Sequence, residues 1–205
     1  EGYNYRYLLG QAYFYSTQYE EAIEAFMAIR DIENTRYQAD AARYVADAYE
    51  YIITDRAKQD NDYVYALPLD QLVERVNERK MSLEDAPTSI LLSQAVTVAS
   101  KEEIDAELEK RRGGSKVRPM PEDVQNLIDA REVFSDIEMK IGQTEAADAL
   151  APQYRYDNAM IYYNYGNFEE AEKRFSEIIE KSPTSQHASS AADIIIAEYD
   201  LRGDL

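Results

Sequence analysis

The residue types that most often carry out catalysis are scarce in this chain, and their spacing favours no enzymatic mechanism. His187 is the only histidine, and it stands near Ser185, Ser189 and Ser190. A serine nucleophile also needs an orienting acid and an oxyanion site, and no motif supplies them here. The absence of cysteine excludes a thiol nucleophile, a disulfide and a Cys-ligated metal. We therefore expect no catalytic residues, no metal and no cofactor, and we interpret His187 as a surface side chain.

Paired acids are more frequent, but their spacing does not suit acid–base catalysis. The pairs are Glu20-Glu21, Glu102-Glu103 and Glu169-Glu170. Adjacent residues on a helix point about 100° apart, so the two carboxylates of a pair cannot converge on one substrate atom. We interpret the pairs as solvated helix faces. The alternating acids of a calcium-binding EF-hand loop are also missing.

One short segment gathers basic residues in an acidic chain. It contains Lys110, Arg111, Arg112, Lys116 and Arg118 around Gly113 and Gly114. This basic loop could dock an acidic partner or hold a phosphate on its glycine-rich backbone, or it could fold against the protein's own acidic surface. The spacing of a nucleotide-binding P-loop is not met. We leave the alternatives open and expect no bound nucleotide.

The overall charge excludes several classes of partner. The chain has 40 acidic and 22 basic residues, a formal net charge of −18. This charge argues against nucleic acid or an anionic membrane as the main partner. The longest apolar stretch, Ile90 to Ala99, is about half of what a transmembrane helix needs. Since the sequence begins at Glu1, we expect a processed or trimmed piece, with any membrane anchor removed or absent.

Tyrosine divides the chain into two similar ends and a different middle. Sixteen of the 18 tyrosines lie within residues 3–51 and 154–199, and residues 66–153 contain none. The low numbers of glycine (7) and proline (6) favour helices. The two ends also share a motif, since Tyr19 to Phe26 matches Phe168 to Phe175 in its aromatic residues, two glutamates and alanine. An internal repeat of this kind decides the architecture.

Each copy of the motif belongs to a predicted helix–turn–helix. The apolar periodicity predicts helices over residues 3–15, 19–32, 153–164 and 168–180, with turns at 16–18 and 166–167. In the first helix, the apolar stripe is expected at Leu8, Leu9, Ala12 and Tyr13.

These motifs resemble the tetratricopeptide repeat (TPR), whose two helices carry Leu-Gly-x-x-Tyr and Ala-x-x-x-Phe. The matching residues are Leu9, Gly10, Tyr13, Ala22 and Phe26 in the first copy and Ala159, Tyr162, Ala171, Phe175 and Pro183 in the second. Two further first helices are predicted over residues 36–53 and 185–201. The usual tryptophan is absent, Asn34 stands where proline belongs, and Asp60 to Asp62 replace the expected continuation of the second repeat.

The resemblance implies a concave groove lined by the first helix of each repeat. Its positions fall on Asn4, Tyr7, Gln11, Phe14, Tyr15, Asp40, Arg43, Asp47, Glu50, Tyr51, Gln153, Tyr156, Met160, Tyr163 and Asn164. Tyrosine is over-represented at binding surfaces because it combines a large apolar ring with a polar tip. We expect these residues to bind a protein partner. The alternative is that the tyrosines pack against the middle segment or cover the core.

The middle of the chain, residues 54–150, is predicted to be a mostly helical insert. Helices are expected over residues 69–80 and 101–112, and a third runs from Pro121 to Gly142. Ile90 to Ala99 could be a strand or a short helix. Because about three repeats are needed for a stable array, we expect the helix after Pro121 to replace the missing second helix of repeat two.

The sequence therefore predicts an all-α protein, a short TPR-type helical solenoid interrupted by a mostly helical insert. Its parts are an N-terminal TPR segment (1–53), the insert with the basic loop and amphipathic helix (54–150), and a C-terminal TPR segment (151–205). The expected function is a non-enzymatic scaffold that binds a partner protein through the tyrosine-rich groove. The alternative is a structural subunit of a larger multiprotein machine, which contacts its neighbours through its outer faces and basic loop.

A connector near the C-terminus suggests a cellular setting. Ser182 to Ala188 resembles the connector of TPR proteins in the Gram-negative envelope, such as the barrel-assembly lipoprotein and the Tol–Pal-associated periplasmic protein. The resemblance implies a periplasmic or outer-membrane-associated protein of a bacterial envelope assembly. A cytoplasmic location is the alternative.

Overall fold

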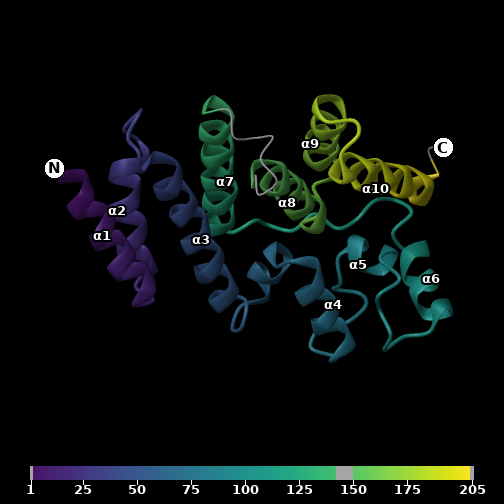
Figure 1. Cartoon of the computed structure of the whole chain (residues 1–205). Coiled ribbons are helices and arrows are strands. Elements are labelled where there is room, and N and C mark those ends of the chain that lie inside the picture. Colours follow the sequence, from purple (N-terminus) through teal and green to yellow (C-terminus); the bar gives the residue numbers. More distant parts are fainter. Residues whose placement is uncertain (1, 142–149, 204–205) are drawn as a thin grey trace. The chain divides into compact units, whose positions relative to one another are not determined.

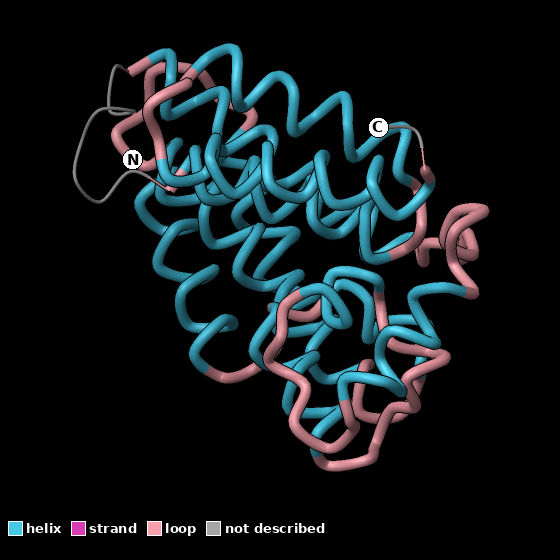
Figure 2. The backbone as a smooth tube through the Cα atoms, turned by 90° about the vertical axis from the view of Figure 1, so that its right-hand side faces the viewer, coloured by secondary structure: helices cyan, strands magenta, loops and turns pink. Residues whose placement is uncertain are grey.

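The computed structural model describes residues 2–141 and 150–203, and every regular element in these ranges is a helix (Figures 1 and 2). The helices are α1 (Gly2–Tyr15), α2 (Tyr19–Arg30), α3 (Gln38–Arg56), the 3-10 helix η1 (Asn61–Ala66), α4 (Leu69–Asn77), α5 (Thr88–Leu92), α6 (Lys101–Glu109), α7 (Glu122–Lys140), α8 (Ala151–Asn164), α9 (Phe168–Lys181) and α10 (Gln186–Arg202). The all-α prediction is confirmed, and the predicted helices lie within a few residues of the observed ones. The ambiguous stretch Ile90 to Ala99 begins as the end of α5 and continues without regular structure. The expected stop at Gly142 lies outside the described residues.

The chain divides into two compact units, each made of two separate stretches of sequence. The first unit comprises Glu1–Tyr63 and Pro121–Arg155, and the second comprises Val64–Met120 and Tyr156–Leu205. Residues 54–150, predicted as one insert, therefore contribute to both units. The division into two repeat segments and an insert stays a prediction from sequence similarity.

In the first unit, α1 and α2 form a close antiparallel pair. Gly10 of α1 faces the ring of Phe26, and a β-carbon at position 10 would lie 2.8 Å from that ring. Phe26 is fully buried, as are Ala22 and Ile29 on the same face of α2. A glycine at this position lets the two helices approach closely. This is the role that the repeat pattern predicts for Gly10.

Helix α3 is the centre of the first unit, because both α2 and α7 pack along it. α7 begins after Pro121, whose missing N–H costs nothing at a helix start, and Glu122 and Asp123 lie in its first turn. Its buried residues Phe134 and Ile137 join the core that α2 and α3 share. The helix after Pro121 therefore packs on α3, and its expected role as the substitute second helix of repeat two stays a prediction.

The second unit combines short helices of the insert with the C-terminal helices. α9 and α10 pack together around Phe175, which is fully buried. An extended segment after α6 crosses the turn between α8 and α9, where the Arg118 amide donates to the carbonyl of Tyr165 at 2.8 Å. Gly166 has a φ of +79°, and its lack of a side chain leaves room for the backbone of Lys116.

Candidate functional site

The most distinctive surface of the first unit is formed by α1 and α3. Three side-chain hydrogen bonds join residues that are 33 positions apart. Tyr37 donates to Asn4 at 2.7 Å, Tyr7 donates to Asp40 at 3.4 Å, and Gln11 donates to Tyr44 at 3.2 Å. Because the partners advance together along both helices, α1 and α3 run parallel to each other. We call this surface the α1–α3 face.

Stacked aromatic rings form the base of the α1–α3 face. The Phe26 ring stacks on Tyr44 at 4.6 Å, and Tyr7 stacks on Tyr37 at 4.5 Å. Phe14 meets the edge of Tyr44 at 5.1 Å. Tyr7 and Phe14, two predicted groove residues, are therefore half-buried and hold the helices together. The alternative role that the sequence left open for the tyrosines, covering the core, applies in part to Tyr7.

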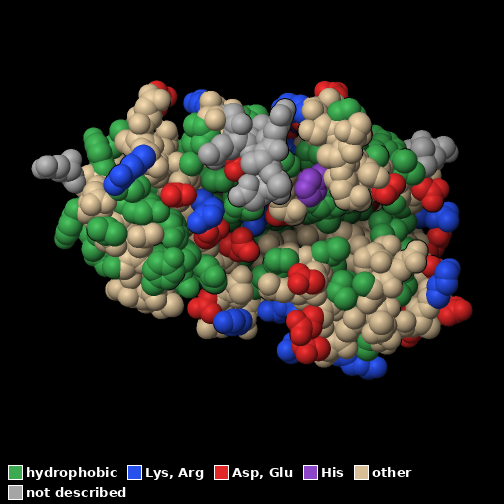
Figure 3. All heavy atoms as spheres, viewed as in Figure 1, with side chains coloured by type: hydrophobic (Ala, Val, Ile, Leu, Met, Phe, Trp, Pro, Cys, Tyr) green, Lys and Arg blue, Asp and Glu red, His purple; other side chains and the backbone are tan. Residues whose placement is uncertain are grey.

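A stripe of apolar side chains on α1 points outward beside these rings. Tyr5, Leu8 and Tyr15 are 70%, 55% and 72% exposed, and Ala12 is also exposed. Positions 5, 8, 12 and 15 recur at helical spacing, so these four residues form one stripe, which we call the α1 stripe. Figure 3 shows hydrophobic side chains gathered over the N-terminal helices. Contiguous exposed apolar patches of this kind are uncommon on protein surfaces.

The α1 stripe corrects the expected orientation of the first helix. Leu8 and Ala12 were expected to share one apolar stripe with Leu9 and Tyr13, but Leu8 and Ala12 are exposed, whereas Leu9 and Tyr13 are half-buried. The buried side of α1 passes through Gly10, because that residue contacts Phe26 of α2. Gly10 was the sequence signal that could have fixed the orientation, since Tyr5 lies on the opposite side of the helix.

Helix α3 also carries a partly buried polar cluster. Tyr154 donates to Asp47 at 3.1 Å, and Arg43 approaches the same carboxylate at 4.0 Å. Burial raises the pKa of Asp47, and burial together with the charge of Asp47 raises the pKa of Tyr154. Arg131 of α7 pairs with Glu50 at 3.0 Å. The predicted groove residues Arg43, Asp47 and Glu50 are therefore largely engaged within the unit.

The second unit does not offer Tyr163 and Asn164 as groove residues, which corrects that prediction. Tyr163 is buried and donates to the buried Glu198 at 2.8 Å. Asn164 is also buried, where it accepts from Ser89 at 2.6 Å and donates to the carbonyl of Tyr65 at 3.3 Å. Glu198 of α10 engages Tyr163 and residues of the insert engage Asn164, so neither side chain is accessible to a partner.

The other predicted groove residues of α8 are only partly accessible. Tyr156 and Met160 are half-buried and pack against the core of α9 and α10, whereas Gln153 is exposed. His187, expected at the surface, is half-buried beside the Tyr156 ring at 5.3 Å. The exposed aromatic surface is therefore better developed on α1 than on α8.

The basic loop folds against its own unit. Arg111 donates to the carbonyls of Leu83, Glu84 and Ala86, at distances of 2.8 to 3.1 Å. Arg118 lies over the ring of Tyr65 at 4.4 Å. These contacts give both arginines a structural role within the second unit.

The lysines and the remaining arginine of the basic loop are more exposed. Lys110 pairs with Glu107 at 3.0 Å, and Arg112 pairs with Glu109 at 2.6 Å. Lys116 is exposed. These pairs agree with the charge-compensation interpretation of the loop.

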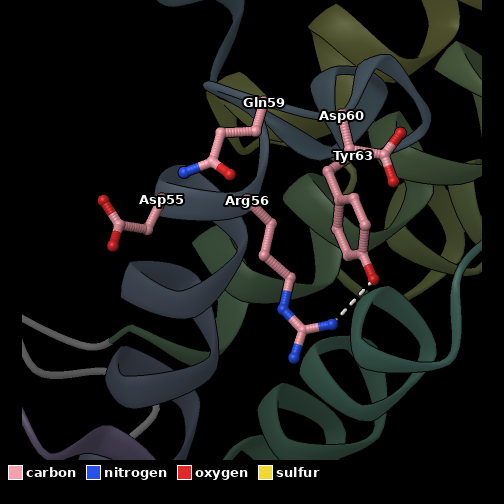
Figure 4. A pocket seen from close by; sticks show the side chains of 5 residues that line it. All are labelled: Asp55, Arg56, Gln59, Asp60 and Tyr63. Carbon is pink, nitrogen blue, oxygen red and sulfur yellow. Dashed lines mark hydrogen bonds between the residues drawn. The ribbon is translucent and has the colours of Figure 1, made fainter.

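A pocket of about 310 Å³ lies at the end of α3 (Figure 4). Arg56 donates to the Tyr63 hydroxyl at 3.0 Å and pairs with Asp123 at 2.6 Å. Asp55 and Gln59 point away from this pair. Four of the five lining residues are exposed, and only Arg56 and Tyr63 bond to each other, so the lining presents no nucleophile, general base or set of converging ligands.

Metal-binding clusters and membrane-spanning helices are both absent from the described part of the chain. Residues 2–141 and 150–203 contain no cluster of three or more acidic or histidine side chains that could hold a metal ion. No helix in the same ranges has the length and apolar character needed to cross a bilayer.

The α1–α3 face is thus an aromatic, hydrogen-bonded surface with an exposed apolar stripe. Its rings stack on one another, and the exposed side chains of the α1 stripe lie beside them. Comparisons of this chain with protein-family models, with curated proteins and with solved structures found no match.

Proposed function

We propose that this protein is a non-enzymatic interaction module that binds a partner protein through the α1–α3 face. The observation that carries the proposal is the exposure of Tyr5, Leu8 and Tyr15 in one stripe. Burying such side chains at an interface is favourable by about 25 cal/mol per Å² of apolar surface. The aromatic rings beside them are already packed in the free protein, which lowers the entropy cost of binding.

A TPR-type architecture is part of the proposal. Two antiparallel helix pairs carry matching small and aromatic residues, Gly10 with Phe26 and Ala159 with Phe175. In addition, the 33-residue offset between α1 and α3 is close to the repeat length of the family. These features support repeated helical hairpins whose first helices lie side by side.

The alternative, a structural subunit that docks through its basic loop, has less support. Arg111 and Arg118 are engaged inside the second unit, and Lys110 and Arg112 have acidic partners there. A bacterial envelope setting, periplasmic or outer-membrane associated, rests on the Ser182 to Ala188 connector. We retain it as the proposed setting, with the cytoplasm as the alternative.

A photoreactive amino acid placed at Leu8 tests the proposal in cells. A control carries the same group at Ile196, an exposed apolar residue of α10 in the second unit. We expect position 8 to cross-link one defined partner protein. The purified chain should then bind this partner directly. Binding should weaken when Tyr5 and Tyr15 are changed to serine. Equal cross-linking from both positions, or unchanged binding by the serine variant, would refute the face.

A further inference from the structure

The chemistry of the α1–α3 face indicates which kind of segment fits it, provided that the proposed function holds. The α1 stripe covers ten residue steps, or about 15 Å along the helix. The peptide groups beneath it are hydrogen-bonded within α1, so the face offers no strand edge to an extended peptide. A docked segment must satisfy its own peptide groups, and a helix does so without help. Side chains at helical spacing then match the stripe.

The charges around the stripe define the second property of the partner. Helix α1 contributes only one charged side chain, Arg6. Asp40 lies at the edge of α3 and is exposed, and its carboxylate accepts a long hydrogen bond from Tyr7. Arg43, nearly one turn along α3, pairs with Asp47 instead. Within the described residues, Asp40 therefore has no salt-bridge partner.

The first unit as a whole also carries an excess of negative charge. The sequence of the first unit contains 20 acidic and nine basic residues. On α2, Glu20, Glu21 and Glu24 are all exposed. A second copy of this chain would bring another charge of −18 to the face, and repulsion opposes such a dimer. An acidic partner is disfavoured for the same reason.

We infer that the α1–α3 face binds a cationic amphipathic helix of another protein. The apolar side of that helix packs on Tyr5, Leu8 and Tyr15, and its lysine or arginine residues lie near Asp40. Electrostatic complementarity accelerates the encounter and selects against acidic helices. The apolar contacts then determine how long the complex lasts.

Three synthetic helical peptides test this inference on the full chain. They share one leucine stripe and differ only in the flanking positions, which carry lysine, glutamine or glutamate. We expect calorimetry to rank their affinities in that order, with a lysine advantage over glutamine of at least about threefold at low salt. The advantage should shrink as salt is added, because salt screens exposed charges.

Two pairs of variants locate the binding site. Leu8→Ala should weaken the lysine peptide about fivefold, because it removes buried apolar surface from the interface. Ile196→Ala, an equally exposed position elsewhere, should leave the affinity unchanged. Asp40→Asn should reduce the advantage of the lysine peptide over the glutamine peptide. Asp70→Asn, which changes an exposed aspartate in the first turn of α4, should not.

The outcomes separate the inference from the proposed function. If the three peptides bind equally and Leu8→Ala weakens all of them, the partner charge is wrong and the docking face remains. If the lysine peptide binds but ignores Leu8→Ala, general attraction to an acidic protein explains the binding, and the inference is overturned. If no peptide binds, both the inference and a helix-docking face are contradicted.

Discussion

At the scale of single residues, side-chain size decides how closely α1 and α2 approach. A β-carbon at Gly10 would lie 2.8 Å from the Phe26 ring, which is fully buried and stacked on Tyr44. Contacts with the rings of Tyr7 and Tyr44 also hold the Phe26 ring in place. Close packing of this kind makes an added methyl group costly.

Gly10→Ala should therefore destabilise the first unit. We expect a loss of about 1–3 kcal/mol from overpacking. This loss exceeds the gain of up to about 1 kcal/mol that alanine brings to a helix interior. Urea unfolding measures the difference. Gly2→Ala is the matched control, because no atom lies within 4 Å of its added β-carbon; an equal loss in both variants would argue against the contact with Phe26.

Tyr7 gives the α1–α3 face a dependence on alkaline pH. Burial and the nearby Asp40 carboxylate raise the pKa of Tyr7 from 10.0 to about 12. The unfolded chain thus loses this proton at lower pH than the folded chain does. The stability that Tyr7 contributes is complete below pH 10 and is lost as the pH rises from there towards about 12.

Tyr7→Phe should remove this part of the pH dependence. We expect wild type to lose more stability than the variant between about pH 9 and about pH 11, since phenylalanine has no proton to lose. Denaturant unfolding at the two pH values gives the comparison. Identical losses would show that the Tyr7 proton does not contribute.

At the scale of helices, α7 completes the core of the first unit. Phe134 is buried in the core that it shares with α2 and α3, and its ring meets Tyr154 at 5.4 Å. Phe134→Ala should cost about 3–5 kcal/mol. Ile141→Ala, at the exposed end of the same helix, should change the free energy of unfolding little. A small effect of Phe134→Ala in thermal unfolding would mean that α7 does not support α3.

The crossing segment of the second unit depends on Gly166 in a similar way. Its φ of +79° is costly for a residue with a side chain, and an added β-carbon would overlap the carbonyl oxygen of Lys116. Gly166→Ala should destabilise the protein by more than about 1–2 kcal/mol. Gly113→Ala is the control, because its β-carbon meets nothing within 4 Å. Circular dichroism during heating measures the melting temperatures of the two variants. Equal melting temperatures for Gly166→Ala and Gly113→Ala would show that the close approach of Lys116 to Gly166 is unimportant.

At the scale of the whole molecule, local patterns predicted the helices better than the surfaces. Spacing around Gly10, Ala22 and Phe26 was sufficient for the first hairpin, because the contacts involved are close in sequence. The amphipathic stripe that includes Phe134 likewise predicted that α7 packs on a neighbour. The predicted apolar stripe of α1 was wrong for Leu8 because many residues of this helix are apolar or aromatic. Periodicity alone therefore did not decide whether Leu8 faces the core or the solvent.

The prediction of the groove failed where distant residues meet. Asn164 is occupied by Ser89 and Tyr65, and Arg111 donates to the carbonyl of Leu83. Nothing in the local sequence of Asn164 or Arg111 identifies these partners, because the pairing depends on the tertiary fold. Tyr15, which the resemblance to the repeat placed in the groove, is exposed.

The central claim is that a partner helix docks on α1 and α3, and amide chemical-shift mapping of the full chain tests it most directly. The lysine-bearing peptide is titrated into isotope-labelled protein. The account predicts that shifts concentrate on residues around Tyr5, Leu8, Tyr15 and Asp40, and that they diminish in the Leu8→Ala variant. Shifts spread evenly over the acidic surface, or concentrated on α10 around Ile196, would contradict it.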